Sequence, residues 1–141
     1  MTTPQENKAL ARRAIDEVWN KGNLAVAREV YGTDFVSHQH SHPNVRDVRG
    51  VSALVQFVRE FRDAFPDFHD TIDDQVAEGD KVVTRFTSTG THKGVLMGLP
   101  PTNKRATWMG IAIDRIEDGK IVEEWVSWDL FGMMQQLSAI T

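Results

Sequence analysis

The sequence predicts a single α+β domain over residues 1–141, in which a curved, mainly antiparallel sheet wraps around N-terminal helices. Before residue 66, apolar side chains recur with the 3.6-residue period of amphipathic helices. After residue 67 they alternate with a period of two, which indicates strands joined by glycine-containing turns. A chain of 141 residues also buries enough surface to fold without disulfides or a structural metal.

Three helices are predicted in the first half of the chain. The first spans about residues 6–20 and is ended by Gly22, and a short second helix follows over residues 24–30. The third opens at residues 50–52 and stops at Pro66, which cannot continue a helix. Its apolar face is formed by Leu54, Val55, Phe57, Val58, Phe61 and Phe65.

Strands dominate the second half. A first strand begins near Phe35, before the third helix, and a last helical segment follows Asp129. The turn signals Glu78-Gly79-Asp80 and Asp118-Gly119 join two hairpins. The predicted strands cover residues 68–77, 81–92, 105–117 and 121–128. The loop over residues 93–103 is apolar, so we expect it to serve as a pocket lid, a subunit contact or a flap on its own sheet.

Composition excludes several classes of function. The formal net charge of −4, without any basic run, argues against a nucleic-acid partner. The absence of cysteine excludes thiol chemistry and thiolate metal sites, and it fits a reducing compartment. The polar N-terminus and the lack of a long apolar stretch predict a cytoplasmic protein without a membrane partner.

Short motifs along nearly the whole chain resemble those of one protein family. They include Ala64-Phe65-Pro66-Asp67, Glu78-Gly79-Asp80-Lys81-Val82-Val83, Gly90-Thr91-His92-Lys93-Gly94, Met97-Gly98-Leu99-Pro100-Pro101-Thr102, Asp118-Gly119-Lys120-Ile121-Val122-Glu123-Glu124-Trp125 and Trp128-Asp129. Together they resemble the SnoaL-like polyketide cyclase, or ester cyclase, family. This family lies within the superfamily typified by nuclear transport factor two.

The resemblance implies a cone-shaped α+β barrel with a deep pocket between sheet and helices, and it implies a homodimer. It also implies acid/base chemistry without metal or organic cofactor: an intramolecular aldol cyclisation, or a lyase or isomerase reaction, on a small hydrophobic carbonyl compound. In such cyclases an aspartate at the strand-to-helix junction is the acid/base, and Asp129 matches that position. His38 resembles a pocket position. The alternative is a non-catalytic protein of the same fold that binds a small ligand.

The residues around Asp129 allow two interpretations of their own. Strand alternation places Asp129 on one face with Glu123 and Trp125. If that face lines a cavity, desolvation raises the pKa of the Asp129 carboxyl towards the range of a useful general acid or base. Alternatively, Asp129 is the N-cap of the last helix.

Further side chains are candidates for substrate binding, with ordinary core or solvated positions as the alternative. His92 ends a strand near the apolar loop and could hydrogen-bond a substrate oxygen. Arg85 lies on a polar strand face, and alternation does not tell inside from outside. A wall on which a flat apolar molecule could stack is predicted from Phe86, Trp108, Met109, Trp125 and Trp128.

The pattern His38, His40 and His42 could place three imidazoles on one side of a strand, as a metal site requires. Pro43 and Asn44 indicate instead that the strand has ended by His42. We therefore predict no metal site here, and a loop with His38 as one pocket histidine. The apolar loop and the outer face of the sheet also predict self-association.

Overall fold

The computed structural model describes residues 2–137 and shows four α-helices around one sheet, in the α+β class that the sequence predicts. The helices are α1 (Pro4–Arg13), α2 (Ala27–Val30), α3 (Val51–Ala64) and α4 (Leu130–Gln136), with a π-helical segment at Ala14–Asn20 and a 3-10 turn at Leu24–Val26. The strands are β1 (Tyr31–Gln39), β2 (Asp47–Arg49), β3 (His69–Glu78), β4 (Lys81–Thr91), β5 (Arg105–Glu117) and β6 (Lys120–Trp128).

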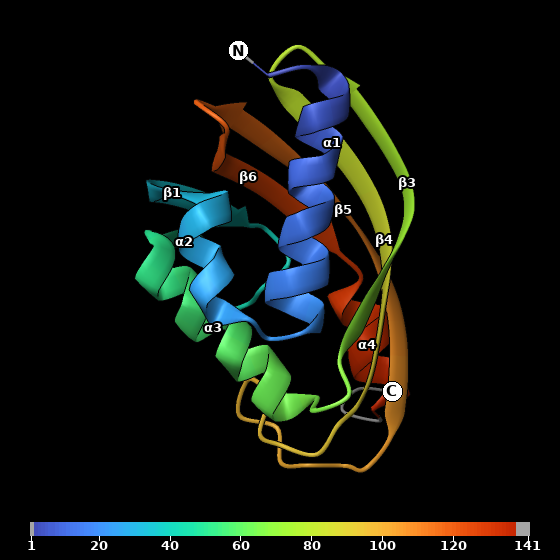
Figure 1. Cartoon of the computed structure of the whole chain (residues 1–141). Coiled ribbons are helices and arrows are strands. Elements are labelled where there is room, and N and C mark those ends of the chain that lie inside the picture. Colours follow the sequence, from blue (N-terminus) through green and yellow to red (C-terminus); the bar gives the residue numbers. More distant parts are fainter. Residues whose placement is uncertain (1, 138–141) are drawn as a thin grey trace.

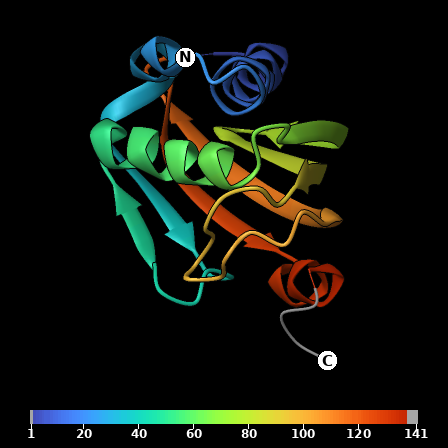
Figure 2. The ribbon, with the colours of Figure 1, turned by 90° about the horizontal axis from the view of Figure 1, so that it is seen from below.

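The six strands form one open, curved sheet in the order β2-β1-β6-β5-β4-β3. All neighbouring pairs are antiparallel except β1 and β6, which run parallel. Helices α1, α2 and α3 lie on one side of the sheet, as Figure 1 and the view from below in Figure 2 show. Helix α4 lies against the start of β5, where Gln136 Oε1 accepts a hydrogen bond from the backbone N–H of Thr107 at 2.8 Å.

Local signals explain where the elements begin and end. Helix α1 starts with a capping box, in which the Thr3 hydroxyl accepts from the Glu6 backbone N–H and the Glu6 carboxylate accepts from the Thr3 N–H, both at 3.1 Å. Gly22, with φ of 66°, ends the first helical run as predicted. The turn between β5 and β6 uses positive φ at both Asp118 and Gly119, which suits a tight two-residue hairpin.

Two features of the sheet were absent from the sequence prediction. Strand β2 was not predicted at all, and β1 begins at Tyr31, well before Phe35. The first helix is also not uniform, because its second half is π-helical from Ala14 onward. These differences share a cause: short strands and helix irregularities are fixed by tertiary packing more than by local periodicity.

The core lies between the helices and the concave face of the sheet, and the apolar loop over residues 93–103 closes one end of it. Leu96 is buried, and the Lys93 and Gly94 backbone N–H groups both donate to the Ala64 carbonyl at the end of α3. The loop therefore packs on its own domain, although Val95 is exposed. No helix within residues 2–137 is long and apolar enough to cross a bilayer.

Candidate functional site

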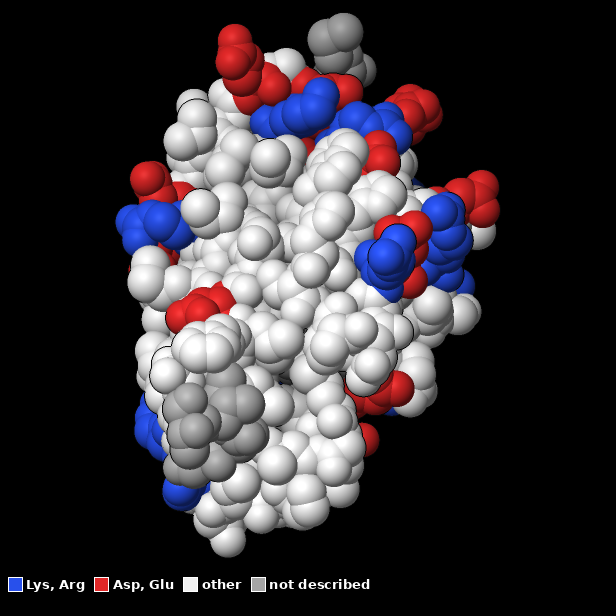
Figure 3. Space-filling model, turned by 180° about the vertical axis from the view of Figure 1, so that it is seen from behind, with Lys and Arg blue, Asp and Glu red and all other residues white. Residues whose placement is uncertain are grey.

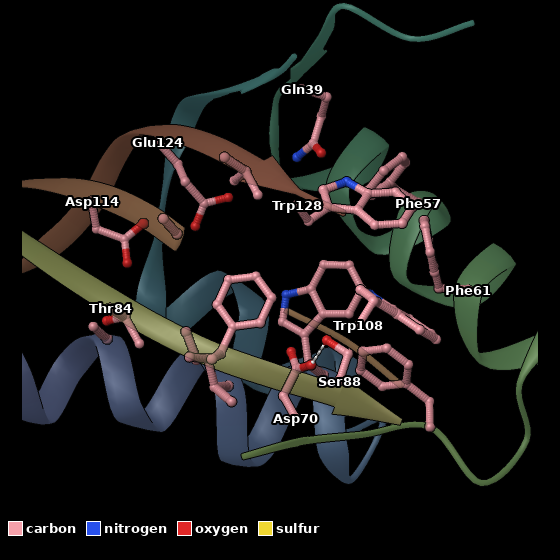
Figure 4. Close-up of a pocket in the computed structure, with 18 of the residues that line it drawn as sticks. Gln39, Phe57, Phe61, Asp70, Thr84, Ser88, Trp108, Asp114, Glu124 and Trp128 are labelled. Atoms are coloured by element: carbon pink, nitrogen blue, oxygen red, sulfur yellow. Dashed lines mark hydrogen bonds between the residues drawn. The ribbon is translucent and has the colours of Figure 1, made fainter. Parts of the chain in front are cut away.

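A pocket with about 700 Å³ of empty space, its open mouth included, lies between the concave face of the sheet and the helices. Strands β3 to β6 supply one wall, and α1, the π-helical segment and α3 supply the other. Figure 4 shows the acidic residues Asp114 and Glu124 at one end and the aromatic rings of Phe57, Phe61 and Trp128 at the other.

Strand alternation determines which side chains enter the pocket. On β4, the side chains of Thr84, Phe86 and Ser88 face inward, and on β6 those of Glu124, Val126 and Trp128 do so. Gly110 of β5 makes room between them. A Cβ at this position would lie 2.5 Å from Cζ of Phe86 and 2.9 Å from Cβ of Trp128. A small residue here therefore lets two aromatic side chains approach each other across the pocket floor.

The apolar wall consists of a continuous set of aromatic rings. Trp128 packs against Trp108 with 6.0 Å between ring centroids and against Phe61 with 5.9 Å. Trp19 contacts Phe57, Phe61 and Phe68 at 5.7 to 6.2 Å from the helical side. Such a wall suits a flat, apolar molecule that stacks on rings. The prediction that Trp108, Trp128 and Phe86 line a pocket agrees with their positions here.

One carboxyl group in this wall has an acidity that suits proton transfer. Asp70 of β3 is buried and accepts a hydrogen bond from the Ser88 hydroxyl of the neighbouring strand. Burial raises the pKa of Asp70 to about 7; the Ser88 hydrogen bond opposes this rise, and the negative charge of Glu124 adds to it. At neutral pH, Asp70 therefore populates both its protonated and its ionised form.

A second acidic pair lies deeper along the strands. Asp114 of β5 and Glu124 of β6 are directly opposite each other, and the Glu124 carboxylate accepts a hydrogen bond from the Ser37 hydroxyl at 3.0 Å. Burial, followed by the adjacent Glu124, raises the pKa of Asp114 well above its ordinary value. The same surroundings raise the pKa of the buried Tyr31 hydroxyl. Two like charges so close do not both ionise easily, so the protonated form of Asp114 is favoured relative to an ordinary aspartate.

The predicted location of Asp129 in an apolar pocket wall is wrong. Its side chain is exposed, and its Oδ1 accepts a hydrogen bond from the Gly132 backbone N–H at 2.9 Å, as the N-cap of α4. The face of β6 that carries Trp125 and Asp129 points away from the helices, and the face with Glu124, Val126 and Trp128 lines the pocket. Alternation was assigned correctly, but the choice of the inward face was reversed. Asp129 lines instead a more open pocket, with about 660 Å³ of empty space, on the outer side of the sheet.

Four other candidates lie on this outer side. The His38 ring stacks on Trp125 at 5.5 Å and bridges two carboxylates, with Nε2 2.8 Å from Glu123 and Nδ1 3.0 Å from Asp47. Neither His38 nor Trp125 lines the pocket. Arg85 and Met109 are exposed and line the outer pocket with Asp129, and Arg85 lies 3.8 Å from the Asp73 carboxylate. None of these four residues lines the pocket between sheet and helices.

The histidines do not converge on one site. His92 is fully buried beside Phe65, and its Nδ1 accepts a hydrogen bond from the Thr102 backbone N–H at 3.2 Å, so it anchors the apolar loop outside the pocket. His40 is exposed, and His42 packs near Phe57. Across residues 2–137, no three His, Cys, Asp or Glu side chains are grouped so that they could hold a metal ion.

The acidic residues of the pocket were missed by the sequence analysis, although one signal was present. Ala112, Asp114 and Ile116 share the buried face of β5, so a carboxylic acid there interrupts an otherwise apolar row. A charged residue at a core position is rarely accidental. Asp70 gave no such signal, because it lies in a strand that contains further acids at Asp73 and Asp74.

The comparisons with known proteins agree with this geometry. The family model of SnoaL-like polyketide cyclases matches residues 9–137. A comparison with curated proteins finds no match. The structure is similar to that of IdmH from Streptomyces antibioticus, described as a candidate polyketide cyclase. The two chains share 30% identity with a TM-score of 0.81, over 94% of this chain and 98% of that one.

Two further solved structures have nearly the same extent. AclR from Streptomyces galilaeus, described as a candidate hydroxylase, is 28% identical with a TM-score of 0.84, over 99% of this chain and 100% of that one. A candidate SnoaL-like polyketide cyclase from Jannaschia sp. CCS1 is 26% identical with a TM-score of 0.88, over 100% and 99%. These likenesses confirm the cone-shaped fold of the nuclear transport factor two type, here with an open sheet.

Proposed function

Because the chain belongs to the SnoaL-like polyketide cyclase family, we propose that it is an enzyme that moves protons on a small, hydrophobic carbonyl compound held in this pocket. The reaction is an intramolecular aldol cyclisation or a related lyase or isomerase reaction. The observation that carries this proposal is Asp70, a buried carboxyl with a pKa of about 7 in an aromatic pocket. A general base works best when its pKa is near the working pH.

The proton moves in a closed cycle in this proposal. The ionised Asp70 removes a proton from the carbon next to a carbonyl, and the C–H electron pair forms an enolate. The enolate carbon attacks a second carbonyl of the same molecule, so that a C–C bond forms and the second oxygen becomes an alkoxide. The protonated Asp70 then returns its proton to that oxygen. Ser88, which donates a hydrogen bond to Asp70, orients the carboxyl for both steps.

The aromatic wall supplies the other part of the catalysis. A chain with several carbonyls has many conformations, and few of them bring the two reacting carbons together. Stacking on Trp108 and Trp128 restricts the chain to a folded form and keeps water away from the enolate. Effects of orientation alone reach several kcal/mol in intramolecular reactions.

The test uses a panel of aromatic compounds that carry several carbonyls along one chain, with binding followed by tryptophan fluorescence and products by mass spectrometry. We expect Asp70→Asn to keep the dissociation constant and lower kcat by at least about 100-fold. The matched control is Asp74→Asn, an exposed position on the same strand. Asp129→Asn tests the assignment made from sequence.

Each outcome of this experiment decides something. Unchanged turnover in Asp70→Asn removes Asp70 from the mechanism, and a loss confined to Asp129→Asn assigns the proton transfer to the helix cap instead. If the wild-type protein binds members of the panel but converts none of them, the chain is a non-catalytic binding protein of the same fold. The apolar walls alone would be sufficient for that role.

We further propose that the protein forms a homodimer, in the cytoplasm, through the outer face of its sheet. Apolar side chains of adjacent strands form a row there, with Val76 opposite Val83 and Ile113 opposite Trp125. Met109 and Ile111 beside them are about half exposed. Figure 3 shows this side of the molecule, with uncharged side chains across the middle and charged ones towards the margin. Monomers rarely expose a large contiguous apolar surface of this kind.

Sedimentation velocity at micromolar concentration measures the proposed association. We expect a dimer for the wild-type chain and a monomer for Ile111→Lys, since a charge in the row is desolvated on association. Gln56→Lys, an exposed change on α3 at the opposite side, is the matched control and stays dimeric. A monomeric wild type at this concentration contradicts the proposal.

A further inference from the structure

The pocket carries negative groups but no positive ones. Three carboxylic acids line it, Asp70, Asp114 and Glu124, and none of the described residues lining it is Lys, Arg or His. Elsewhere in the structure, acids are paired with bases, as Glu123 is with Arg115 at 3.1 Å. The pocket therefore has an electrostatic preference of its own, which the aromatic wall does not explain.

The three acids lie at two separate positions in the pocket, Asp70 at one and Asp114 with Glu124 at the other. Asp70 lies opposite Ser88 on β4, whereas Asp114 lies opposite Val82, six residues further along the same strand. Six residues of strand correspond to roughly 20 Å of backbone, and curvature brings the inward side chains closer than this. Figure 4 shows the Asp114 and Glu124 carboxyl groups together at the end away from Phe57 and Phe61. A ligand that reaches Asp70 can thus present a second group to Asp114.

One atom at this end lacks a partner. Asp114 is 5% exposed and lines the pocket, but its Oδ1 has no hydrogen-bond partner within the described part of the chain. A buried carboxyl oxygen without a partner is unfavourable by about 1 to 3 kcal/mol. The Asp114 side chain lines the pocket and is hydrogen-bonded to Glu124, so a donor on the ligand would add to the interactions that this acid pair makes.

We propose that the Asp114 and Glu124 end of the pocket binds a protonated amine of the ligand, so that the compound is an aromatic carbonyl compound with a basic nitrogen. This inference rests on the proposed function only in that the same pocket holds the ligand. An ammonium donates to Asp114 Oδ1 and is attracted by Glu124 and by the ring of Tyr31, which also lines this end. A carboxylate in the same place would be desolvated next to two acids and is rejected.

The groups next to Asp114 determine how amine binding changes its protonation. The titratable groups that interact with Asp114 are Glu124 on β6 and Tyr31 on β1. Asp70 on β3 lies further along the pocket, and α1 and the π-helical segment line it with the uncharged residues Ala11, Ala14, Ile15 and Trp19. No base compensates the acid pair. An arriving ammonium favours the ionised form of Asp114, so that its binding near neutral pH releases a proton from the protein.

The experiment compares three probes with one ring system: 2-naphthylmethylamine, 2-naphthalenemethanol and 2-naphthoate. We expect calorimetry to show the amine binding at least tenfold more tightly than the alcohol, with the carboxylate weakest. Repeating the amine titration in phosphate and in Tris shows proton release as a difference in apparent enthalpy. An alcohol that binds as tightly as the amine, or no binding by any probe, overturns the inference.

Variants identify which residues cause the preference for the amine over the alcohol. Asp114→Asn and Glu124→Gln are expected to reduce the ratio of amine to alcohol affinity to near one, whereas Glu123→Gln on the outer face of the same strand leaves it unchanged. Asp70→Asn also keeps the ratio, although it abolishes turnover in the proposed function. Loss of the ratio in Asp70→Asn alone places the amine elsewhere and overturns the assignment. If the variants do not fold, the affinities of the three probes for the wild-type protein decide, because an alcohol that binds as tightly as the amine contradicts the inference.

Discussion

Two neighbouring glutamates on β6 show how the surroundings of a carboxylate differ between the two faces of the sheet. Glu123 points outward and lies between His38 and Arg115, so that the pKa of its carboxyl is lowered, chiefly by the hydrogen bond to His38. Glu124 points inward and lies against Asp114 and Ser37. On the outer face, Glu123 pairs with basic side chains, whereas on the inner face Glu124 lies next to another acid. Only on the inner face is the pKa of a carboxyl raised, to about 7 at Asp70.

The tryptophans of the same strand show the same difference in packing. Trp128 faces the pocket and packs against Phe61 and Trp108, which connects it to the core. Trp125 faces outward and stacks on the ring of His38. One face of β6 therefore lines the pocket and the other faces outward, with a glutamate and a tryptophan on each.

The largest expected effect concerns Asp70 and the pH dependence of stability. Its pKa rises from 3.8 to about 7 on folding, so ionised Asp70 destabilises the folded state. This destabilisation is absent below pH 3.8, grows as the pH rises towards 7 and is complete above that, at about 4 kcal/mol. Asp70→Asn should match the wild type at pH 4 and exceed its free energy of unfolding at pH 8. Urea denaturation at both pH values measures this difference.

The control for that experiment lies on the same strand. Asp74→Asn changes the charge equally at an exposed position, so its free energy of unfolding should stay within about 0.5 kcal/mol of the wild type at both pH values. An Asp70→Asn variant whose difference from the wild type does not change between pH 4 and pH 8 would show that Asp70 has an ordinary acidity. The inner and outer faces would then not differ as described.

The two tryptophans give the next largest effect. Trp128→Ala removes a ring that contacts two other core aromatics and should lower the free energy of unfolding by about 3 kcal/mol. Trp125→Ala removes a ring on the solvated face and should lower it by about 1 kcal/mol. Chemical denaturation of both variants is the measurement. Equal losses would mean that the outer ring contributes as much to the core as the inner one.

Most of the fold could be predicted from the sequence because its signals are local. The apolar face of α3, the Asp118-Gly119 turn and the alternation along β5 each depend on a few neighbouring residues. The short β2 and the parallel pairing of β1 with β6 depend on contacts between distant segments, and no local pattern encodes them.

The site was less predictable for a related reason. Alternation separates the two faces of β6 but does not say which one the helices cover, and the choice of the face with Trp125 and Asp129 was therefore wrong. Of the residues chosen as a stacking wall, Trp108, Trp128 and Phe86 line the pocket, whereas Trp125 lies outside it. The acidity of Asp70 depends on burial beside Ser88 of another strand, which only the three-dimensional arrangement shows.

A smaller effect distinguishes the two interpretations of Asp129. As an N-cap, its carboxylate accepts from the Gly132 backbone N–H, so Asp129→Ala should lower the free energy of unfolding by about 1 kcal/mol. Asn caps a helix as well as Asp, so Asp129→Asn should be close to the wild type. Thermal or urea denaturation of the pair measures this difference. An equal loss in both variants would show that the charge, and not the cap, matters.

The smallest effect concerns His38 on the outer face. The hydrogen bond to Glu123, followed by that to Asp47, raises the pKa of His38 above its ordinary value of 6.5. The protonated imidazole therefore stabilises the fold fully below pH 6.5, and this contribution is lost as the pH rises through the folded pKa. Exposed pairs of this kind contribute about 0.5 kcal/mol. His38→Gln should thus differ from the wild type at pH 5.5 and converge with it at high pH. NMR titration of the imidazole should show a midpoint above 6.5 that falls in Glu123→Gln. A midpoint that does not move would mean that the two outer carboxylates leave the acidity of His38 unaffected. The pocket acids would then be different, since burial and the neighbouring Glu124 raise the pKa of Asp114.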